Sequence, residues 1–279
     1  YGVGISPEQI LVTSGTSPAF LFMMLAMLEP GDEVILSNPH YACYPNFIRT
    51  VGGEPVFVRT HPEDGFQYRP EAIKSALTPR TRGIVINSPC NPTGIVMTEE
   101  QLRDIAQFDS QYIISDEIYH GLVYQERAHS ILEYTDKAFV INGFSKLYAM
   151  TGWRLGYLIF PKAFSAVMQR IHQNFMISAN GFIQWAGIAA LTRAQEDVAG
   201  LLNESRKKIA EAKEKLGPQG RINDARRSYE AIIARCAVTG DRTSEADAWN
   251  NLGELEAWLR RRRVTPRAAS GRPGPAPRG

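Results

Sequence analysis

The sequence predicts an α/β domain in which helices cover both faces of a sheet. Between Gln9 and about Phe160, short runs rich in β-branched and aromatic residues alternate with stretches of helical periodicity. Strands that are covered on both faces are typically apolar along their whole length, as these runs are. The chain has 279 residues, 44% of them hydrophobic and 22% charged, which is enough for one large domain or two smaller ones.

Each element follows from a local pattern. Composition predicts seven strands, at residues 10–13, 33–37, 55–59, 83–87, 112–115, 138–142 and 155–160. Apolar spacing predicts helices at residues 18–28, 70–77, 98–108 and 162–175. Thr98 and Gln101 form a predicted capping box at the start of the third helix. A long helical run is expected to follow Gly181 and to continue to Leu216, where the sequence GPQG breaks it.

The C-terminal part has a different character. Residues 209–257 show helical spacing, and the sequence WNNLG at 249–253 is a partial match to a tetratricopeptide helix, which is weak support for a repeat array. Residues 258–279 contain seven of the 31 basic groups and none of the 29 acidic ones. With four prolines, they are expected to form a disordered basic tail, and the rest of the chain is mildly acidic.

Other features of the sequence indicate where in the cell the protein is expected. The longest apolar stretch, residues 20–28, is too short to cross a bilayer. The three cysteines are an odd number without metal-type spacing, so we expect no disulfide framework, no metal site and a reducing cytoplasm. The first residue is Tyr1, so we expect the N-terminus to be incomplete.

Two turns follow predicted strands at the position where open α/β sheets bind ligands. The sequence TSGTS, residues 13–17, ends one strand and opens a helix, so it is either an ordinary helix cap or a phosphate site. The sequence NSPCNPTG, residues 87–94, uses two prolines to fix the backbone and presents Asn91. It is either a rigid turn or a loop that binds a ligand.

Four single residues are candidates for a functional role. Asp116 ends an apolar strand, where a carboxylate is either solvated or lies opposite a cation. Tyr41 follows another strand and is either a core residue or an aromatic that stacks on a flat ligand. Lys146 lies in the apolar run FSKLYAMTGWRLGY, where we expect it to be partly desolvated. Because burial costs a lysine hydration and rotamer entropy, we expect its nitrogen to have a chemical task. Arg154 lies between two apolar residues, which weakens its interpretation as a surface cation.

Together these motifs resemble the fold-type I pyridoxal phosphate enzymes, and specifically the class I/II aminotransferases. The run GFSKLYAMTGWRLG, residues 143–156, fits the lysine signature of that family at every restricted position, and NPTG and the spacing of Asp116 and Tyr119 match it in order. The resemblance implies a three-layer α/β/α large domain with a mostly parallel seven-stranded sheet in residues 1–208. The helical segment 209–257 is atypical of the family.

The resemblance also implies pyridoxal 5'-phosphate as the cofactor and a role for each motif residue. Lys146 would form a Schiff base with the cofactor and carry a proton to and from the substrate α-carbon. Asp116 would pair with the pyridine nitrogen, while Tyr119 and Asn91 would donate to the phenolate oxygen. Tyr41 would stack on the ring. The phosphate would be held by small and basic residues, namely Gly15, Thr16, Ser17, Ser145 and Arg154.

The implied function is an aminotransferase that moves an amino group between an amino acid and a 2-oxo acid, as a cytoplasmic homodimer with no nucleic-acid or membrane partner. One alternative is a lyase on the same scaffold, and another is a cofactor-binding protein with impaired catalysis. Two parts of the family pattern are not found, namely an N-terminal segment over the site and an arginine that clamps the substrate carboxylate. Arg226 and Arg227 are the candidates for that arginine. We therefore expect an intact cofactor half and an impaired substrate half.

Overall fold

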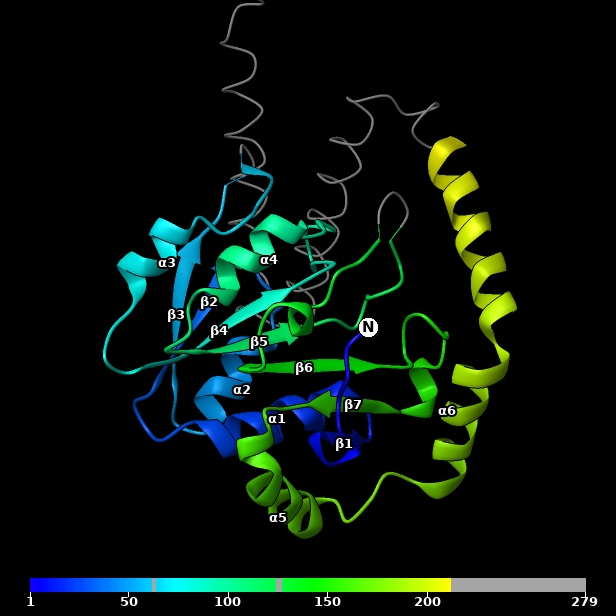
Figure 1. Ribbon diagram of the computed structural model, residues 1–279, viewed down its shortest axis with the longest axis horizontal. Coiled ribbons are helices and arrows are strands. Elements are labelled where there is room, and N and C mark those ends of the chain that lie inside the picture. The colour runs from blue at the N-terminus through cyan, green and yellow to red at the C-terminus, as the bar shows by residue number, and fades with distance from the viewer. Residues whose placement is uncertain (62–63, 124–126, 212–279) are drawn as a thin grey trace, which may run out of the picture. The chain divides into compact units, whose positions relative to one another are not determined.

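A computed structural model describes residues 1–61, 64–123 and 127–211 of the chain. Residues Tyr1–Glu211 form one compact unit around a seven-stranded sheet with the order β1-β7-β6-β5-β4-β2-β3 (Figure 1). The strands are β1 (Ile10–Thr13), β2 (Glu33–Asn38), β3 (Glu54–Arg59), β4 (Thr81–Asn87), β5 (Tyr112–Asp116), β6 (Ala138–Gly143) and β7 (Gly156–Ile159). All seven predicted strands are present, with ends that differ from the prediction by at most two residues.

The direction of the strands decides where the site lies. β7 runs antiparallel to both of its neighbours, β1 and β6, and the other pairs of adjacent strands are parallel. Six strands, β1 to β6, therefore end at the same edge of the sheet, and β7 begins there. The mostly parallel sheet that the resemblance implied is confirmed.

Helices cover both faces of this sheet (Figure 1). One face packs on α1 (Thr16–Met27), α2 (Tyr44–Thr50) and α5 (Ser165–Phe175), and the other on α3 (Pro70–Ala76) and α4 (Glu99–Ala106). Because successive strand residues point to opposite faces, β4 sends Val85 into the first core and Ile84 and Ile86 into the second. The three-layer α/β/α architecture is thus confirmed.

Two helices show how the local sequence selects each layer. Helix α1 is apolar on all sides, and Phe20, Met23 and Met24 are buried in it, so it fits only a central position against the sheet. Helix α4 is preceded by the predicted capping box, in which the Gln101 N–H donates to Thr98 Oγ1 at 3.2 Å and the Thr98 N–H donates to Gln101 Oε1 at 2.8 Å.

The long helix expected after Gly181 is a wrong prediction. Helix α6 (Gly181–Arg193) ends at Ala194, and a second helical segment occupies residues 195–211. At the break, the Gln195 side-chain amide donates to the carbonyl of Leu191 at 2.9 Å and so satisfies an acceptor at the end of α6.

Within the described residues, no helix is both long enough and apolar enough to cross a membrane. The other C-terminal predictions, which are the rest of the helical segment 209–257, its tetratricopeptide-like sequence and the basic tail 258–279, lie outside the part of the chain that the structure describes.

Candidate active site

The edge at which six strands end brings the predicted site residues together. In the sheet register, Thr13 at the end of β1 and Gly143 at the end of β6 both pair with Gly156, the first residue of β7. Asn87 and Asp116, at the ends of β4 and β5, pair with each other along the same edge. The turn that contains Gly15 is therefore adjacent in space to the segment that contains Lys146 and Arg154, although about 130 residues separate them.

Gly15 and Arg154 form the basic end of this edge. Gly15 has a positive φ of 88°, and a Cβ atom placed on it would lie 2.6 Å from Arg154 Nη2, so only glycine lets the guanidinium approach the backbone. The Thr13 hydroxyl fixes the turn by donating to the Gly15 carbonyl at 2.7 Å. Arg154 is held by its own donation from Nη1 to the Thr151 carbonyl at 3.1 Å.

The electrostatics of this end favour an anion. Helix α1 begins at Thr16, directly after Gly15, and its first turn contains no acidic residue. The partial positive charge of a helix N-terminus and the full charge of a guanidinium therefore lie side by side, which is favourable only where an anion binds both. Of the two interpretations of TSGTS, the phosphate site is the one that this arrangement supports.

Asp116 lies at the acidic end of the edge. It is buried, so the alternative of a solvated strand end is wrong. Its Oδ2 accepts a hydrogen bond from the Tyr44 hydroxyl at 2.7 Å, and its Oδ1 accepts one from the Ile118 N–H at 3.1 Å. Burial raises the pKa of the Asp116 carboxyl, while these two hydrogen bonds and the charge of Lys146 oppose the rise.

Lys146 lies between these two ends. It follows β6, and its Nζ lies 5.5 Å from the centre of the Tyr119 ring, within the range of a cation–π contact. The side chain is exposed, which corrects the expectation of a partly desolvated lysine. The physical reason is that residues 144–150 form the turn at the open edge of the sheet, where the neighbouring apolar side chains turn inward and the lysine points outward.

The loop that presents Asn91 is tied to Asp116 through a residue that the sequence did not single out. The Asn87 side-chain amide donates to the Asp116 carbonyl at 2.8 Å, and Asn87 Oδ1 accepts from the Asn91 N–H at 2.6 Å. Both prolines of the loop follow cis peptide bonds, at Ser88–Pro89 and Asn91–Pro92. The two hydrogen bonds of Asn87 thus anchor the loop to the candidate site.

The aromatic side of the site contains one expected residue and one that was missed. Tyr41 is half-exposed, and its ring packs edge-to-face on Tyr44 with centroids 5.4 Å apart. A hydrogen bond with Cys43, burial and the nearby Asp116 raise the pKa of Tyr41 to about 12. Tyr44 was missed, because its bond to Asp116 joins residues 72 positions apart. The only signal available was the spacing of the two tyrosines in YACY, which places them on one side of a helical turn.

Of the remaining predicted residues, Ser17 is exposed in the first turn of α1, and Ser145 adjoins Lys146 with its carbonyl accepting from the Thr151 hydroxyl at 2.9 Å. The edge therefore presents a guanidinium beside a helix N-terminus, an exposed amine and a buried carboxyl in one row. Such a row suits a flat ligand with a phosphate at one end and a basic nitrogen at the other.

The sequence is similar to those of several aminotransferases. It is 39% identical over 198 residues to the aspartate/prephenate aminotransferase of Thermus thermophilus, a match that covers 70% of this chain and 51% of that protein. It is 41% identical over 199 residues to the (5-formylfuran-3-yl)methyl phosphate transaminase of Methanocaldococcus jannaschii, again 70% of this chain and 51% of that protein. The chain thus spans about half the length of these relatives.

A comparison with solved structures also finds aminotransferases. The aromatic aminotransferase of Pyrococcus horikoshii superposes with a TM-score of 0.73 and 34% sequence identity, over 80% of this chain and 61% of that one. The model of the family described as aminotransferase class I and II matches residues 1–218, more than three quarters of the chain. The chain belongs to the class I and II aminotransferase family.

Proposed function

We propose that the chain is the cofactor-binding part of a pyridoxal phosphate-dependent aminotransferase, which moves an amino group between an amino acid and a 2-oxo acid. The observation that carries the proposal is the row formed by the anion site at Gly15 and Arg154, the amine of Lys146 and the buried carboxyl of Asp116. The names of the relatives, which are all transaminases acting on different compounds, support the reaction more than any one substrate.

The residues present fit pyridoxal 5'-phosphate. The close approach of Arg154 to Gly15 leaves a guanidinium and the N-terminus of α1 facing the same point, which suits a phosphate dianion. Asp116 is a carboxyl fixed by two donors, which suits a protonated ring nitrogen. When bound, this cofactor supplies an aldehyde that takes up an amine and a ring that withdraws electrons from the substrate α-carbon.

Each residue then has a distinct task. Lys146 supplies the amine that holds the cofactor and afterwards moves a proton at the α-carbon. Asp116 would keep the proton on the ring nitrogen, since its charge is stabilised by the Tyr44 hydroxyl. Tyr119 and Asn91 would donate to the phenolate oxygen, and Tyr41 would stack on the ring. The phosphate would be held by the basic end of the edge: Gly15, Thr16, Ser17, Ser145 and Arg154.

The proposal names the substrate only as a class of compounds. The arginine that would clamp a substrate carboxylate was expected at Arg226 or Arg227, and both lie outside the described residues. We therefore propose amino acids and 2-oxo acids as a class, without choosing a side chain. A cytoplasmic location also belongs to the proposal, supported by the free thiols of Cys43 and Cys90.

The proposal is tested by locating the cofactor. Purified protein is incubated with pyridoxal phosphate, reduced with borohydride and digested, and mass spectrometry is expected to find the adduct on Lys146 alone. Lys146→Ala should lose the adduct, whereas Lys162→Ala, which changes another exposed lysine of the same unit, should keep it. An adduct on a different lysine, or none in the wild type, would refute the assignment. Assay of the products formed from amino acids then separates transamination from elimination by a lyase.

We also propose that the chain forms a homodimer through α6. Phe182 and Trp185 lie on this helix with 67% and 73% of their surfaces exposed, and Phe175 and Ile177 just before it are exposed to a similar degree. Apolar side chains gathered in this way are typical of protein interfaces. Light scattering should give twice the chain mass for the wild type and for Leu25→Glu, which changes an exposed apolar residue on α1, but one chain mass for Trp185→Glu. A monomeric wild type would contradict the proposal.

A further inference from the structure

Glu117 is a second buried carboxyl, directly after Asp116, and the proposed reaction gives it no task. Only 1% of its surface is exposed. The two neighbours face different sides of the sheet: Asp116 meets Tyr44 on α2, whereas Glu117 meets the segment that leads into η3 (Ile131–Glu133). Its Oε1 accepts three hydrogen bonds, from the Ser115 hydroxyl at 2.9 Å, the Ser130 hydroxyl at 3.0 Å and the Ile131 N–H at 3.2 Å.

The other oxygen of Glu117 faces a nitrogen that also lacks a partner. Among the described residues, Glu117 Oε2 and His120 Nδ1 are both buried side-chain atoms without a hydrogen bond, and they lie 3.6 Å apart. Buried polar atoms are almost always paired, because leaving one unpaired forfeits its hydration. Each atom is therefore the natural partner of the other, provided that a proton lies between them.

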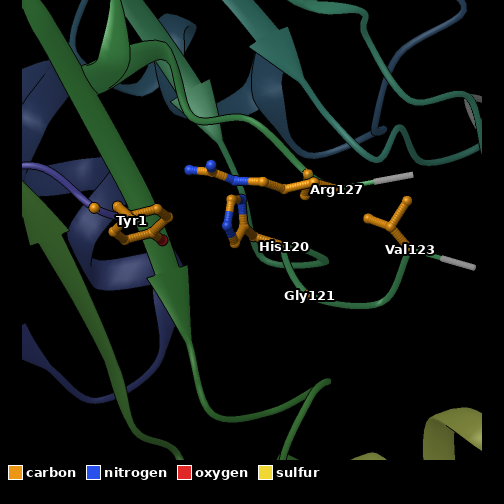
Figure 2. Close-up of a pocket in the computed structure, with 7 residues that line it drawn as sticks. Tyr1, His120, Gly121, Val123 and Arg127 are labelled. Carbon is orange, nitrogen blue, oxygen red and sulfur yellow. The ribbon is translucent and has the colours of Figure 1, made fainter.

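His120 is fixed in the position from which it meets Glu117. Its backbone N–H donates to the Glu117 carbonyl at 2.8 Å, and its ring packs edge-to-face on Tyr1 with centroids 4.7 Å apart. Figure 2 shows His120 beside Tyr1 and Arg127 in a pocket of about 370 Å³. His120 lines this pocket, whereas Glu117 is not among the lining residues.

We propose that Glu117 and His120 share one proton and act as a positioning pair, which holds the segment from Asp116 to Tyr119 in place behind the cofactor site. This inference rests on the proposed function, because it assigns the pair to the residues that hold the cofactor ring. The pair acts through the backbone: its two members bracket Tyr119, and the Glu117 N–H donates to the Ile141 carbonyl of β6 at 2.9 Å. Neither member is proposed to touch substrate or cofactor.

The surrounding charges favour keeping the shared proton. The ionisable groups that face the pair come from several elements: Asp116 on β5, Tyr157 on β7, Glu133 on η3, Arg127 and His129 before η3, and the phenol and amino group of Tyr1. The Glu133 carboxylate already pairs with His129 Nδ1 at 3.0 Å and with Arg127 Nη2 at 3.7 Å. Its charge is therefore compensated by these two residues and not by His120. An ionised Glu117 would place a second buried negative charge next to Asp116.

The pKa values of the two groups agree with this geometry. Burial raises the pKa of the Glu117 carboxyl to about 7, and burial lowers the pKa of the His120 imidazole to about 4. Between these two values the carboxyl keeps its proton and the imidazole takes none from water, which leaves one proton for the pair.

The first experiment measures how stability depends on pH in the protein without cofactor. A raised carboxyl pKa means that the folded state binds the proton more tightly than the unfolded state, so Glu117 makes the free energy of unfolding fall as pH rises from the ordinary carboxyl range to about 7. A lowered imidazole pKa means the reverse, so His120 makes it rise as pH rises from about 4 to the ordinary imidazole range. In the wild type the two slopes oppose each other.

Each single replacement should leave only the pH dependence of stability that the remaining group causes. Glu117→Gln is expected to leave stability rising between pH 4 and pH 6, whereas His120→Asn is expected to leave it falling. If the two residues are coupled, the unfolding equilibrium constant of the double variant should differ by about fivefold or more from the value expected when the two single effects are independent. Residues in contact typically show coupling of this size. Glu100→Gln, a change on the exposed side of α4, should match the wild type. Additive effects and equal slopes in both single variants would overturn the shared proton.

The second experiment tests positioning through cofactor affinity. Glu117→Gln keeps an oxygen for the three donors, so its affinity for pyridoxal phosphate should stay within about threefold of the wild type, whereas Glu117→Leu should bind about tenfold more weakly. If the leucine variant does not fold, Ser130→Ala removes one donor and should give a smaller loss in the same direction. Equal affinity in all variants would refute positioning. A wild type that binds no cofactor would refute the proposed function instead, and the stability slopes would still decide whether the proton is shared.

Discussion

The two halves of the sheet edge are built in opposite ways. The half formed by β4 and β5 is buried, and Asp116 is fixed there by hydrogen bonds to its carboxyl from Tyr44 and Ile118 and to its backbone carbonyl from Asn87. The half between β6 and β7 is open, and both Lys146 and Arg154 are exposed on it. A carboxyl that must keep one position is held by the core, whereas groups that meet an incoming ligand lie on a turn at the surface.

The open half also contains backbone strain that the buried half lacks. Ala149 and Arg154 have φ values of 52° and 54°, in the left-handed region that is costly for residues other than glycine. Gly156 lies close to the Gly15 turn, because a Cβ atom placed on it would lie 2.7 Å from the Gly15 carbonyl carbon. In this conformation the Arg154 guanidinium lies beside Gly15, the residue directly before α1.

The largest effect is expected at the buried half. Asp116→Ala should leave Lys146 able to bind the cofactor but remove the partner of the ring nitrogen. Exchange of the substrate α-hydrogen with solvent, followed by NMR, should then slow by about 10²- to 10³-fold, the usual loss when one preorganised electrostatic partner is removed. Asp116→Glu, which keeps a carboxyl, should recover part of the rate. Exchange at the wild-type rate in Asp116→Ala would show that the ring nitrogen has another partner.

A smaller effect is expected at the open half. Arg154→Ala removes a charge-assisted hydrogen-bond donor to the phosphate, so the Kd for pyridoxal phosphate should rise by about 10- to 100-fold, measured by quenching of tryptophan fluorescence. Arg154→Lys should recover only part of the affinity, because a lysine lacks the planar fork of donors. Arg170→Ala, on the exposed surface of α5, is the matched control and should bind normally. An unchanged Kd in Arg154→Ala would place the phosphate elsewhere.

The contrast between the halves also marks what the sequence could predict. Strands such as β1, which matches its predicted range at both ends, are defined by local composition, and the capping box of α4 is defined by two residues three positions apart. The row of Gly15, Asp116 and Lys146 was expected because strand ends in an open sheet converge on one edge. These features depend on short-range patterns or on a general rule of topology.

The features that were missed depend on distant contacts. The spacing of the two tyrosines in YACY is the one local signal for Tyr44, and it does not indicate that the hydroxyl meets a carboxyl 72 residues away. The exposure of Lys146 was mispredicted because apolar neighbours were taken as a sign of burial, whereas the turn at the sheet edge points the lysine outward. Likewise, the Gln195 side chain satisfies a carbonyl at the end of α6, a contact that an apolar spacing pattern does not register.

The smallest effect is expected for Tyr44→Phe, which tests how firmly the buried half is held. The variant loses one hydrogen bond to a buried carboxyl, and the free energy of unfolding without cofactor should fall by about 1.5 kcal/mol. Tyr68→Phe is the matched control, since its buried hydroxyl donates to the neutral Val85 carbonyl at 2.8 Å and should cost a similar or smaller amount.

The two tyrosine variants should differ in pH dependence rather than in size of effect. The Tyr44 hydrogen bond lowers the pKa of Asp116 against the rise that burial causes, so Tyr44→Phe should raise that pKa further. A carboxyl with a raised folded-state pKa binds its proton more tightly when folded, and stability is therefore lost as pH rises from the ordinary carboxyl range through the folded-state pKa. In Tyr44→Phe this loss should extend to higher pH than in the wild type, whereas Tyr68→Phe should keep the wild-type profile. Parallel profiles for the two variants would mean that Tyr44 only fills space beside Asp116, and that the donors from Ile118 and Asn87 suffice to hold the buried half of the site.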